Sequence, residues 1–273
     1  MRLGIFAKTF SGDDPLSVLR AAHQAGYAAV QYNMTCSGLP ALPDSVPQGT
    51  VAAIVSATRE TGVALAAVSG TYNMIHPDPA QRQMGLRRLS VLIDHAAGMG
   101  TGMVTLCTGS RDAVDQWRHH PDNQSAEASR DLLAEMEKAC HLAEARGVKL
   151  GIEPELANVV NNAVTARRLM NELKSPALAI VLDPANLFEI SPPDLRNKTI
   201  ESAIDLLADR IAMTHAKDRY ADGSFATAGK GVVDFTHFIK HLKTAGFDGD
   251  LVTHGLSAEE AASVAAHLKD CGA

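Results

Sequence analysis

The sequence predicts an α/β fold in which the whole chain, residues 1–273, forms a single (β/α)₈ barrel. Short apolar runs recur along the chain, and a helix-ending glycine precedes many of them. Such runs are typical of buried strands in a parallel sheet that is covered on both faces. A chain of 273 residues also suits this barrel, for which about 250 residues is usual.

A joint between a helix and the following strand recurs along the chain. Its glycine, which is followed each time by an apolar run, is Gly26, Gly62, Gly100, Gly147 or Gly246. Glycine just past a helix end supplies the left-handed residue of a C-cap, so each joint marks where a helix stops and a strand begins. Serial strand–helix units of this kind predict a barrel. An open doubly wound sheet is the alternative, but no GxGxxG follows the first strand to support it.

Turn and cap signals place the units of the first half. We expect strands at residues 2–7, 29–32, 64–68 and 103–106. Asp14-Pro15 and Asp78-Pro79 each offer an N-cap followed by proline at the first helical position, so they start the helices after the first and third strands. A long polar loop follows the fourth strand, and Ser125 then caps what we expect to be the longest helix.

The apolar runs of the second half stop at polar residues. They begin near residues 149, 179, 211 and 251 and lead to Glu153, Asp183, His215 and His254. Between them, Asn162 and Asp234 cap the fifth and seventh helices, and the sixth helix is expected near residues 200–207. Ser257 and Glu260 have the spacing of a capping box for the last helix.

Composition and charge exclude several classes of protein. No apolar run approaches the roughly 18 residues of a membrane span, and the first run, broken by Lys8, is too short for a signal peptide. The net charge of −6, without a basic block, argues against nucleic acid binding. The cysteines lie far apart and form no CxxC pair, which indicates reduced thiols in a cytoplasmic protein. They are Cys36, Cys107, Cys140 and Cys271.

The polar residues at the ends of the last four strands predict a metal site. Side chains alternate along a strand, and this alternation points four of them into the barrel mouth: Glu153, Asp183, His215 and His254. Converging buried carboxylates and imidazoles need a cation to offset their desolvation. Oxygen and nitrogen ligands suit Mn²⁺, Zn²⁺, Co²⁺ or Mg²⁺, and the absence of cysteine ligands argues against structural zinc. One such residue alone is usually a solvated loop residue, but four at strand ends favour a metal.

The segments GIEPE, VLDPAN, THAKD and FDGDLV, with AGKGVVDF between the last two, resemble the sugar phosphate isomerase/epimerase family of xylose isomerase-like TIM barrels. The resemblance covers nearly the whole chain. It implies a divalent ion, often manganese, held by Glu153, Asp183 and His215. The family usually has a glutamate at the fourth ligand position, where this sequence has His254.

The resemblance also implies isomerisation or epimerisation of a ketose or related keto-sugar, with or without a phosphate. The ion would polarise the carbonyl, and Glu153 would remove the neighbouring proton to give an enediolate. Return of the proton to the opposite face, with His254 as second base, would invert that carbon; return to the adjacent carbon would isomerise the sugar. If His254 binds the ion instead, its lone pair is committed, and chemistry with Glu153 as the one base is favoured.

Other side chains at the rim are candidates for substrate binding: Lys8, His76, Arg111, Trp117, Glu155, Asn186 and Lys217. Several have a structural alternative, since Lys8 can be a surface lysine, His76 a backbone cap and Trp117 a packing residue of its own loop. The loop that carries Arg111 and Trp117 is long enough to predict a lid. Glu155 either supports Glu153 or contacts substrate. The turn at residues 229–231 could cradle a phosphate, although a plain turn is the simpler interpretation.

Two other functions fit the same barrel: a metal-dependent lyase, hydrolase or endonuclease, and a non-catalytic sugar-binding barrel that has lost its second glutamate. An endonuclease would need more ligands and a basic groove, which the net charge of −6 disfavours. The expected partner is a small sugar, with no nucleic acid and no membrane, and the chain is compatible with a homo-oligomer.

Overall fold

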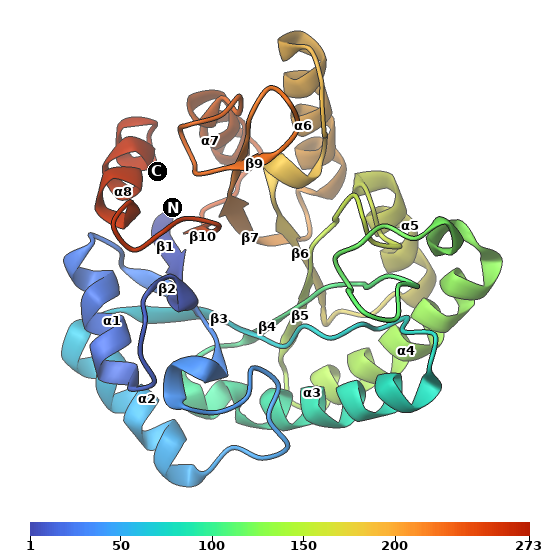
Figure 1. Ribbon diagram of the computed structural model, residues 1–273, viewed down its shortest axis with the longest axis horizontal. Coiled ribbons are helices and arrows are strands. Elements are labelled where there is room, and N and C mark those ends of the chain that lie inside the picture. Colours follow the sequence, from blue (N-terminus) through green and yellow to red (C-terminus); the bar gives the residue numbers. More distant parts are fainter.

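The computed structural model describes residues 1–273 and confirms the predicted barrel (Figure 1). Eight parallel strands close in the order β1-β10-β7-β6-β5-β4-β3-β2, and eight helices surround them. The barrel strands are β1 (Arg2–Phe6), β2 (Ala29–Tyr32), β3 (Ala64–Ser69), β4 (Met103–Leu106), β5 (Lys149–Ile152), β6 (Leu178–Leu182), β7 (Ile211–Ala216) and β10 (Asp250–Thr253). The helices are α1 (Pro15–Gln24), α2 (Gln48–Thr61), α3 (Pro79–Met99), α4 (Ala126–Glu144), α5 (Ala163–Leu173), α6 (Pro193–Leu207), α7 (Phe235–Thr244) and α8 (Ala261–Asp270).

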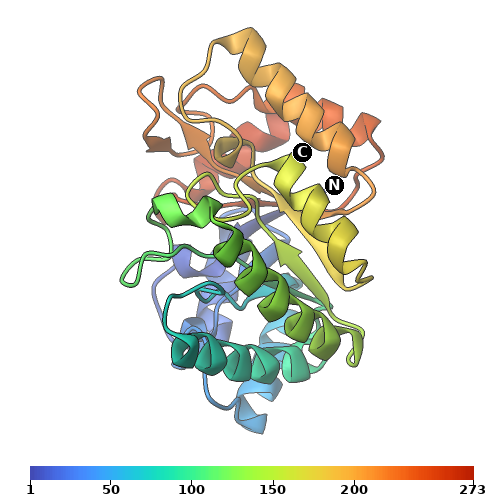
Figure 2. The same cartoon turned by 90° about the vertical axis from the view of Figure 1, so that its right-hand side faces the viewer.

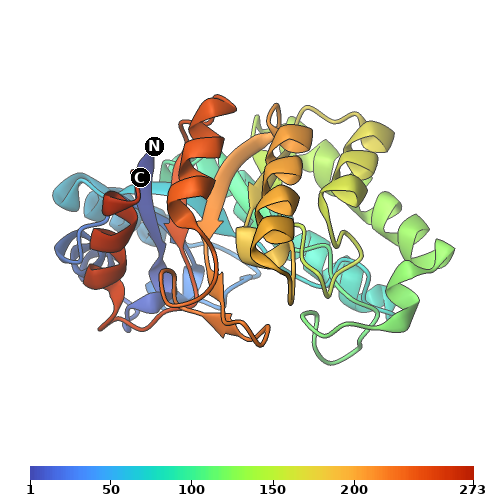
Figure 3. The same ribbon diagram turned by 90° about the horizontal axis from the view of Figure 1, so that it is seen from above.

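Short elements decorate the carboxyl ends of the barrel strands. A two-stranded antiparallel hairpin, β8 (Asp218–Arg219) and β9 (Phe225–Ala226), follows β7 directly. Figures 2 and 3 show that this hairpin and the loop between β4 and α4 project from the same rim of the barrel. Single turns of 3₁₀ helix lie at η1 (Ala7–Thr9), η2 (Met34–Ser37), η3 (Pro121–Gln124) and η4 (Pro184–Asn186).

The inside of the barrel changes from apolar to polar toward this rim. Its apolar part is a cluster of seven buried residues: Ala29, Ala66, Ala67, Met103, Val181, Met213 and Val252. Gly151 of β5 makes room for this packing, because a Cβ there would lie 2.8 Å from Cγ2 of Val181. Two residues further along β2, β3 and β4, the interior is lined by the buried polar side chains of Gln31, Ser69 and Thr105. Polar groups therefore begin one layer below the mouth.

The helices pack on the outside of the strands, where 65 buried residues form the main core. Five predicted N-caps are confirmed, since each accepts a hydrogen bond from a backbone N–H of the first helical turn: Asp14, Asp78, Ser125, Asn162 and Asp234. The glycines of the helix-to-strand joints all have positive φ, between 64° and 92°. The left-handed conformation that these joints require explains why glycine recurs there.

Three predictions about the helices are wrong, one about a length and two about where a helix begins. α3, with 21 residues, is longer than α4, with 19, so Ser125 does not cap the longest helix. α6 begins at Pro193 rather than near residue 200, because its first turns are mostly exposed and carry no apolar stripe that the sequence could reveal. At α8, the Glu260 carboxylate accepts the Ser257 N–H as in a capping box, but residues 258–260 form a turn and the helix begins at Ala261.

None of the helices combines the length and the apolar character needed to cross a membrane. The four cysteines are free thiols, as predicted, and only Cys271 is partly exposed.

Candidate metal centre

Three of the predicted ligands meet at the carboxyl end of the barrel. One ligand atom each from Glu153, Asp183 and His215 lies within 4.8 Å of the others. His215 Nδ1 is 3.3 Å from Glu153 Oε1 and 3.9 Å from Asp183 Oδ2. Glu153 and Asp183 directly follow β5 and β6, and His215 is the penultimate residue of β7. Consecutive parallel strands therefore bring these three residues together, as their positions in the sequence predicted.

Two atoms of this triad are buried without a hydrogen-bond partner, namely Asp183 Oδ2 and His215 Nδ1. Asp183 is fully buried, and its other oxygen accepts the backbone N–H of Ala185. Oδ2 lies near the Lys217 ammonium, with Nζ 3.3 Å away. A buried acceptor without a hydrogen bond costs about 1–3 kcal/mol, so both atoms are suited to take a ligand. Oxygen and imidazole donors that converge in this way fit a divalent cation. The triad can therefore hold a metal ion.

A polar network under the triad orients His215. Gln31 donates from Nε2 to Ser69 Oγ at 3.0 Å and to Thr105 Oγ1 at 3.2 Å, so its Oε1 faces away from these hydroxyls. This Oε1 lies 2.7 Å from His215 Nε2, which must carry the proton to donate to it. Nδ1 then keeps its lone pair and points toward the two carboxylates. Gln31 thus selects the tautomer that binds a metal.

The charges around the triad are balanced by one buried lysine. Burial disfavours the ionised form of Glu153, but the positive charge that His215 carries when its ring is protonated, together with that of Lys217, outweighs burial and holds the pKa of Glu153 well below its usual range. Burial raises the pKa of Asp183, and Lys217, with Nζ 3.3 Å from Oδ2, offsets only part of this effect. Lys217 is desolvated too, yet Asp183 and Glu153 raise its pKa. The site therefore contains a permanent cation beside the triad.

A second carboxylate, Glu155, lies beside Glu153. Asn186 Nδ2 donates to Glu153 Oε1 at 2.7 Å and to Glu155 Oε2 at 3.1 Å, and so bridges the two side chains. Burial, together with the negative charge of Glu153, raises the pKa of Glu155 to about 7. Glu155 and Asn186 therefore support Glu153 in this structure, and their contact with substrate stays a prediction.

His254 lies at the mouth but outside the group of three ligands. Its ring stacks on His215, with centroids 5.4 Å apart and planes at 27°, and on Phe6 at 4.8 Å. Its Nδ1 is buried without a partner. Burial and the nearby His215 and Lys217 lower the pKa of His254 to about 3, so the imidazole is neutral. Its role as fourth ligand or as free base stays a prediction.

The THAKD segment contributes a structural aspartate as well as a ligand. Asp218 is buried and accepts four backbone N–H bonds, from Arg219, Gly229, Gly231 and Val233. These bonds fold the glycine-rich turn before α7. Gly231 has no room for a side chain, because a Cβ there would lie 2.4 Å from Asp218 Oδ1. Since the N–H groups of Gly229 and Gly231 belong to Asp218, this turn is a structural one and does not cradle a phosphate.

Of the remaining predicted substrate contacts, Lys8 lies beside the mouth, whereas His76, Trp117 and Arg111 lie on or beside the β4–α4 loop. Lys8 is exposed next to the mouth, close enough to His254 to contribute to its lowered pKa. His76 and Trp117 line one cavity of about 290 Å³ under the tip of the β4–α4 loop. His76 accepts the Asp78 N–H with Nδ1, which is the backbone cap considered as its alternative role. Arg111 turns toward α4 and pairs with Asp131 at 2.8 Å.

The loop from β4 to α4 is anchored by amide side chains that the sequence did not single out, and two of them, Asn123 and Asn158, are buried. Asn158 accepts the Gly109 N–H and donates to Gln116 O, at 3.0 and 3.1 Å. Asn123 donates to Ala157 O at 2.8 Å, and Asn73 to Ser110 O at 2.7 Å. Backbone groups of the loop are thus tied to the rest of the rim. Closure of this loop over a substrate stays a prediction.

Gln31 is the other important residue that sequence reasoning missed. The signal was present, because alternation along β2 points Gln31 into the barrel, where an uncharged polar residue is unexpected. Arg219, next to Asp218, was also missed. It is buried, and its guanidinium donates to the carbonyl groups of Ala185 and Gly223.

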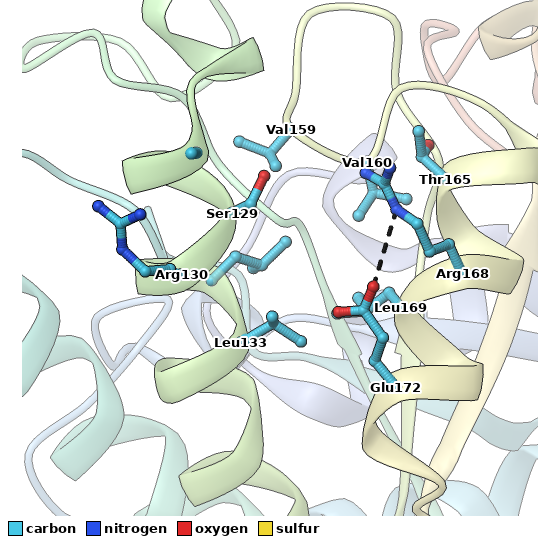
Figure 4. Close-up of a pocket in the computed structure, with 11 residues that line it drawn as sticks. Ser129, Arg130, Leu133, Val159, Val160, Thr165, Arg168, Leu169 and Glu172 are labelled. Atoms are coloured by element: carbon cyan, nitrogen blue, oxygen red, sulfur yellow. Dashed lines mark ion pairs between the residues drawn. The ribbon is translucent and has the colours of Figure 1, made fainter.

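Two grooves on the outside of the barrel carry no such chemistry. Figure 4 shows the groove between α4 and α5, of about 320 Å³, in which an ion pair joins Arg168 and Glu172 of the same helix. A second groove, of about 460 Å³, lies between α5 and α6 and is lined by Leu195 and Leu206. Neither contains converging metal-binding side chains, so the barrel mouth is the candidate site.

Comparison with known proteins agrees with the barrel fold. The sequence model of the xylose isomerase-like TIM barrels matches residues 19–271. Among solved structures, a 3-keto-D-glucoside 4-epimerase from E. coli superposes with a TM-score of 0.80 at 17% identity, over 99% of this chain and 100% of that chain. A D-allulose 3-epimerase from a Methylomonas species gives 0.74 at 17% identity, over 99% and 98%. An L-ribulose 3-epimerase gives 0.76 at 17% identity, over 98% and 92%. A search of curated protein sequences gave no match.

Proposed function

Because the chain belongs to the xylose isomerase-like TIM barrel family, we propose that it is a divalent-metal-dependent isomerase or epimerase of a ketose or related keto-sugar. The observation that carries this proposal is the triad of Glu153, Asp183 and His215, whose ligand atoms converge and in which Asp183 Oδ2 and His215 Nδ1 are buried without a hydrogen bond. The structures it resembles are named as epimerases of free ketoses and of a keto-glucoside, which supports a sugar as substrate. The free thiols support a cytoplasmic location.

The ligand set suits Mn²⁺, and a divalent ion bound there would supply the Lewis acidity that polarises a substrate carbonyl. Glu153 is held ionised and oriented by Asn186, so it is the group placed to remove a proton next to that carbonyl. The electron pair of the broken C–H bond moves onto the carbonyl oxygen and gives an enediolate. The Lys217 ammonium is positioned to stabilise this negative oxygen.

The destination of the proton decides the product. Delivery to the opposite face of the same carbon gives the epimer, and delivery to the neighbouring carbon gives the isomer. His254 is neutral and has a free Nδ1 at the mouth, so it can accept a hydrogen bond from substrate or take part in proton return. Its position outside the triad favours a free imidazole over a fourth ligand.

The test is exchange of the substrate α-proton in deuterated buffer, followed by mass spectrometry. Protein loaded with Mn²⁺ should introduce one deuterium into its ketose, and the Glu153→Gln protein should not. A sugar that binds without any exchange would identify a non-catalytic sugar-binding barrel. Cleavage or dehydration of the sugar would identify a hydrolase or lyase instead.

A further inference from the structure

Two histidines of α7 face two carboxylates of α6 on the outside of the barrel. His237 Nε2 lies 2.7 Å from Glu201 Oε1, and His241 Nε2 lies 2.9 Å from Asp205 Oδ1. The two helices lie side by side (Figure 1), and in each of them the two residues are four positions apart. Residues at this spacing share one face of a helix. The four side chains therefore meet along one seam, which we call the α6–α7 cluster.

The two carboxylates of the α6–α7 cluster have no lysine or arginine partner. Their only ion-pair partners are the two imidazoles, and each Nε2 donates to its carboxylate. With neutral imidazoles the cluster carries two negative charges, which one divalent cation would neutralise. An imidazole that moves its proton to Nδ1 can bind such a cation through Nε2. The cluster therefore offers two nitrogen and two carboxylate ligands whose total charge matches that of the ion.

The two histidines have the spacing of a helical metal site. In the segment HFIKH, residues 237–241, the imidazoles stand at i and i+4, the spacing by which a helix presents two histidines to one zinc ion. Their rings are nearly parallel, with planes at 21° and centroids 6.3 Å apart. Phe238 and Ile239 between them are buried in the core and fix this helix. The histidine side chains are 34% and 26% exposed, so an ion can reach both.

We propose that the α6–α7 cluster is a second metal site, which takes Zn²⁺ or a similar borderline cation such as Co²⁺ or Ni²⁺ and joins the two helices. Two imidazoles with carboxylates suit these ions better than Mg²⁺, which prefers oxygen ligands alone. The inference goes beyond the proposed function, because the cluster shares no residue with the triad.

Binding requires a local movement of the side chains. The ligand atoms form two separate pairs in this structure, and only the triad forms a compact ligand group. Two imidazole nitrogens on one zinc ion lie about 3.3 Å apart, as tetrahedral zinc–nitrogen bonds of about 2.0–2.1 Å require. Rotation of partly exposed side chains between their rotamers supplies this approach, while the helices stay in place. The ion would link α6 to α7, the helices that follow β6 and β7.

The test counts Zn²⁺ equivalents by equilibrium dialysis followed by elemental analysis, all at one free Zn²⁺ concentration. His237→Gln and His241→Gln should each bind about one equivalent less than wild type. Glu201→Gln should bind that equivalent more weakly, since it keeps a hydrogen-bond acceptor and loses the charge. His23→Gln, which changes an exposed histidine of α1, is the matched control and should bind as wild type does.

Thermal unfolding gives a second measurement. An ion that binds only the folded chain stabilises it, so Zn²⁺ should raise the Tm of wild type by more than that of His241→Gln. Unchanged Zn²⁺ stoichiometry in both histidine variants of α7, or the same loss in His23→Gln, overturns the second site. An equivalent that is lost in His241→Gln and retained in Asp183→Asn supports the cluster, even where the triad proves to bind no ion. An equivalent lost only in Asp183→Asn leaves the proposed function intact and overturns this inference.

Discussion

The two halves of the barrel rim differ in chemistry. β5, β6, β7 and β10 carry the ionisable groups of the site, namely Glu153, Asp183, His215 and His254. β2, β3 and β4 carry neutral polar side chains under the triad, namely Gln31, Ser69 and Thr105. These two sets meet at one hydrogen bond of 2.7 Å, between Gln31 Oε1 and His215 Nε2.

This difference separates reactive groups from the groups that position them. In the ionisable half, two of the candidate ligand atoms are buried without a hydrogen bond. The neutral half is fully hydrogen-bonded at Gln31, whose amide contacts two hydroxyls and one imidazole. Substitutions in the ionisable half should therefore lower the rate of proton exchange directly. Substitutions in the neutral half should act through metal affinity or through the order of the loops. The predictions below test this contrast.

The largest effect is expected in the ionisable half. Glu153→Gln removes both a ligand and the proposed base, and exchange should fall by about 10⁴-fold, the upper range for loss of general base catalysis. Asp183→Asn should lower Mn²⁺ occupancy, measured by elemental analysis, from near one equivalent. Chelation of wild-type protein with EDTA should stop exchange, and added Mn²⁺ should restore it. Full occupancy and full exchange in both variants would contradict the metal site.

His254 lies in the same half, but its effect should be smaller and limited to turnover. Because its ring lies outside the triad, His254→Gln should keep its Mn²⁺ while exchange falls by about 100-fold. Loss of metal in this variant would identify His254 as the fourth ligand and would favour one-base chemistry by Glu153. Unchanged metal and unchanged exchange would make His254 a bystander.

Gln31 tests the neutral half. Gln31→Leu removes the acceptor that keeps the proton on His215 Nε2, so Mn²⁺ affinity should fall about 10- to 100-fold, as for other groups that orient a ligand. Calorimetric titration with Mn²⁺ measures this without any substrate. Ser69→Ala is the matched control, because Thr105 still holds the Gln31 amide, and its loss of affinity should be smaller. Equal Mn²⁺ affinity in Gln31→Leu and wild type would show that Gln31 only fills space.

The sequence predicted the barrel and the three ligands because both follow from local rules. Glycine joints and N-caps mark where helices end and begin, and the two-residue period of a strand decides which side chains face inward. A ligand at a strand end is therefore visible as soon as the strand is recognised. This held for Glu153, Asp183 and His215, which lie on neighbouring strands.

What the sequence did not reveal depends on contacts between distant segments. Gln31 is separated from His215 by 184 positions, and only the closed barrel brings them together. Arg111 lies on the expected loop, yet its guanidinium turns to Asp131 of α4, a choice that no local pattern determines.

The smallest effect on chemistry is expected at the amide anchors of the β4–α4 loop. Asn158→Ala leaves the buried Gly109 N–H without an acceptor, which should destabilise the protein by about 1–3 kcal/mol in urea unfolding. The same change frees Gln116 O, so trypsin should cut faster at the exposed Arg118. Exchange should fall only a few-fold, because the loop carries none of the triad.

The control for this last experiment is Asn162→Ala, four residues away. It removes the cap of α5 and should also cost about 1 kcal/mol, but it does not touch the loop. If both variants are cut equally fast at Arg118, global destabilisation explains the cleavage and Asn158 is not an anchor. If the loop acts as a lid, bound sugar should slow cleavage at Arg118 in the wild-type protein. The slowing should be smaller in Asn158→Ala, because a loop that has lost its Asn158 anchor gains less order when it closes. Cleavage that is the same with and without a sugar undergoing exchange would show that this half of the rim is a fixed wall.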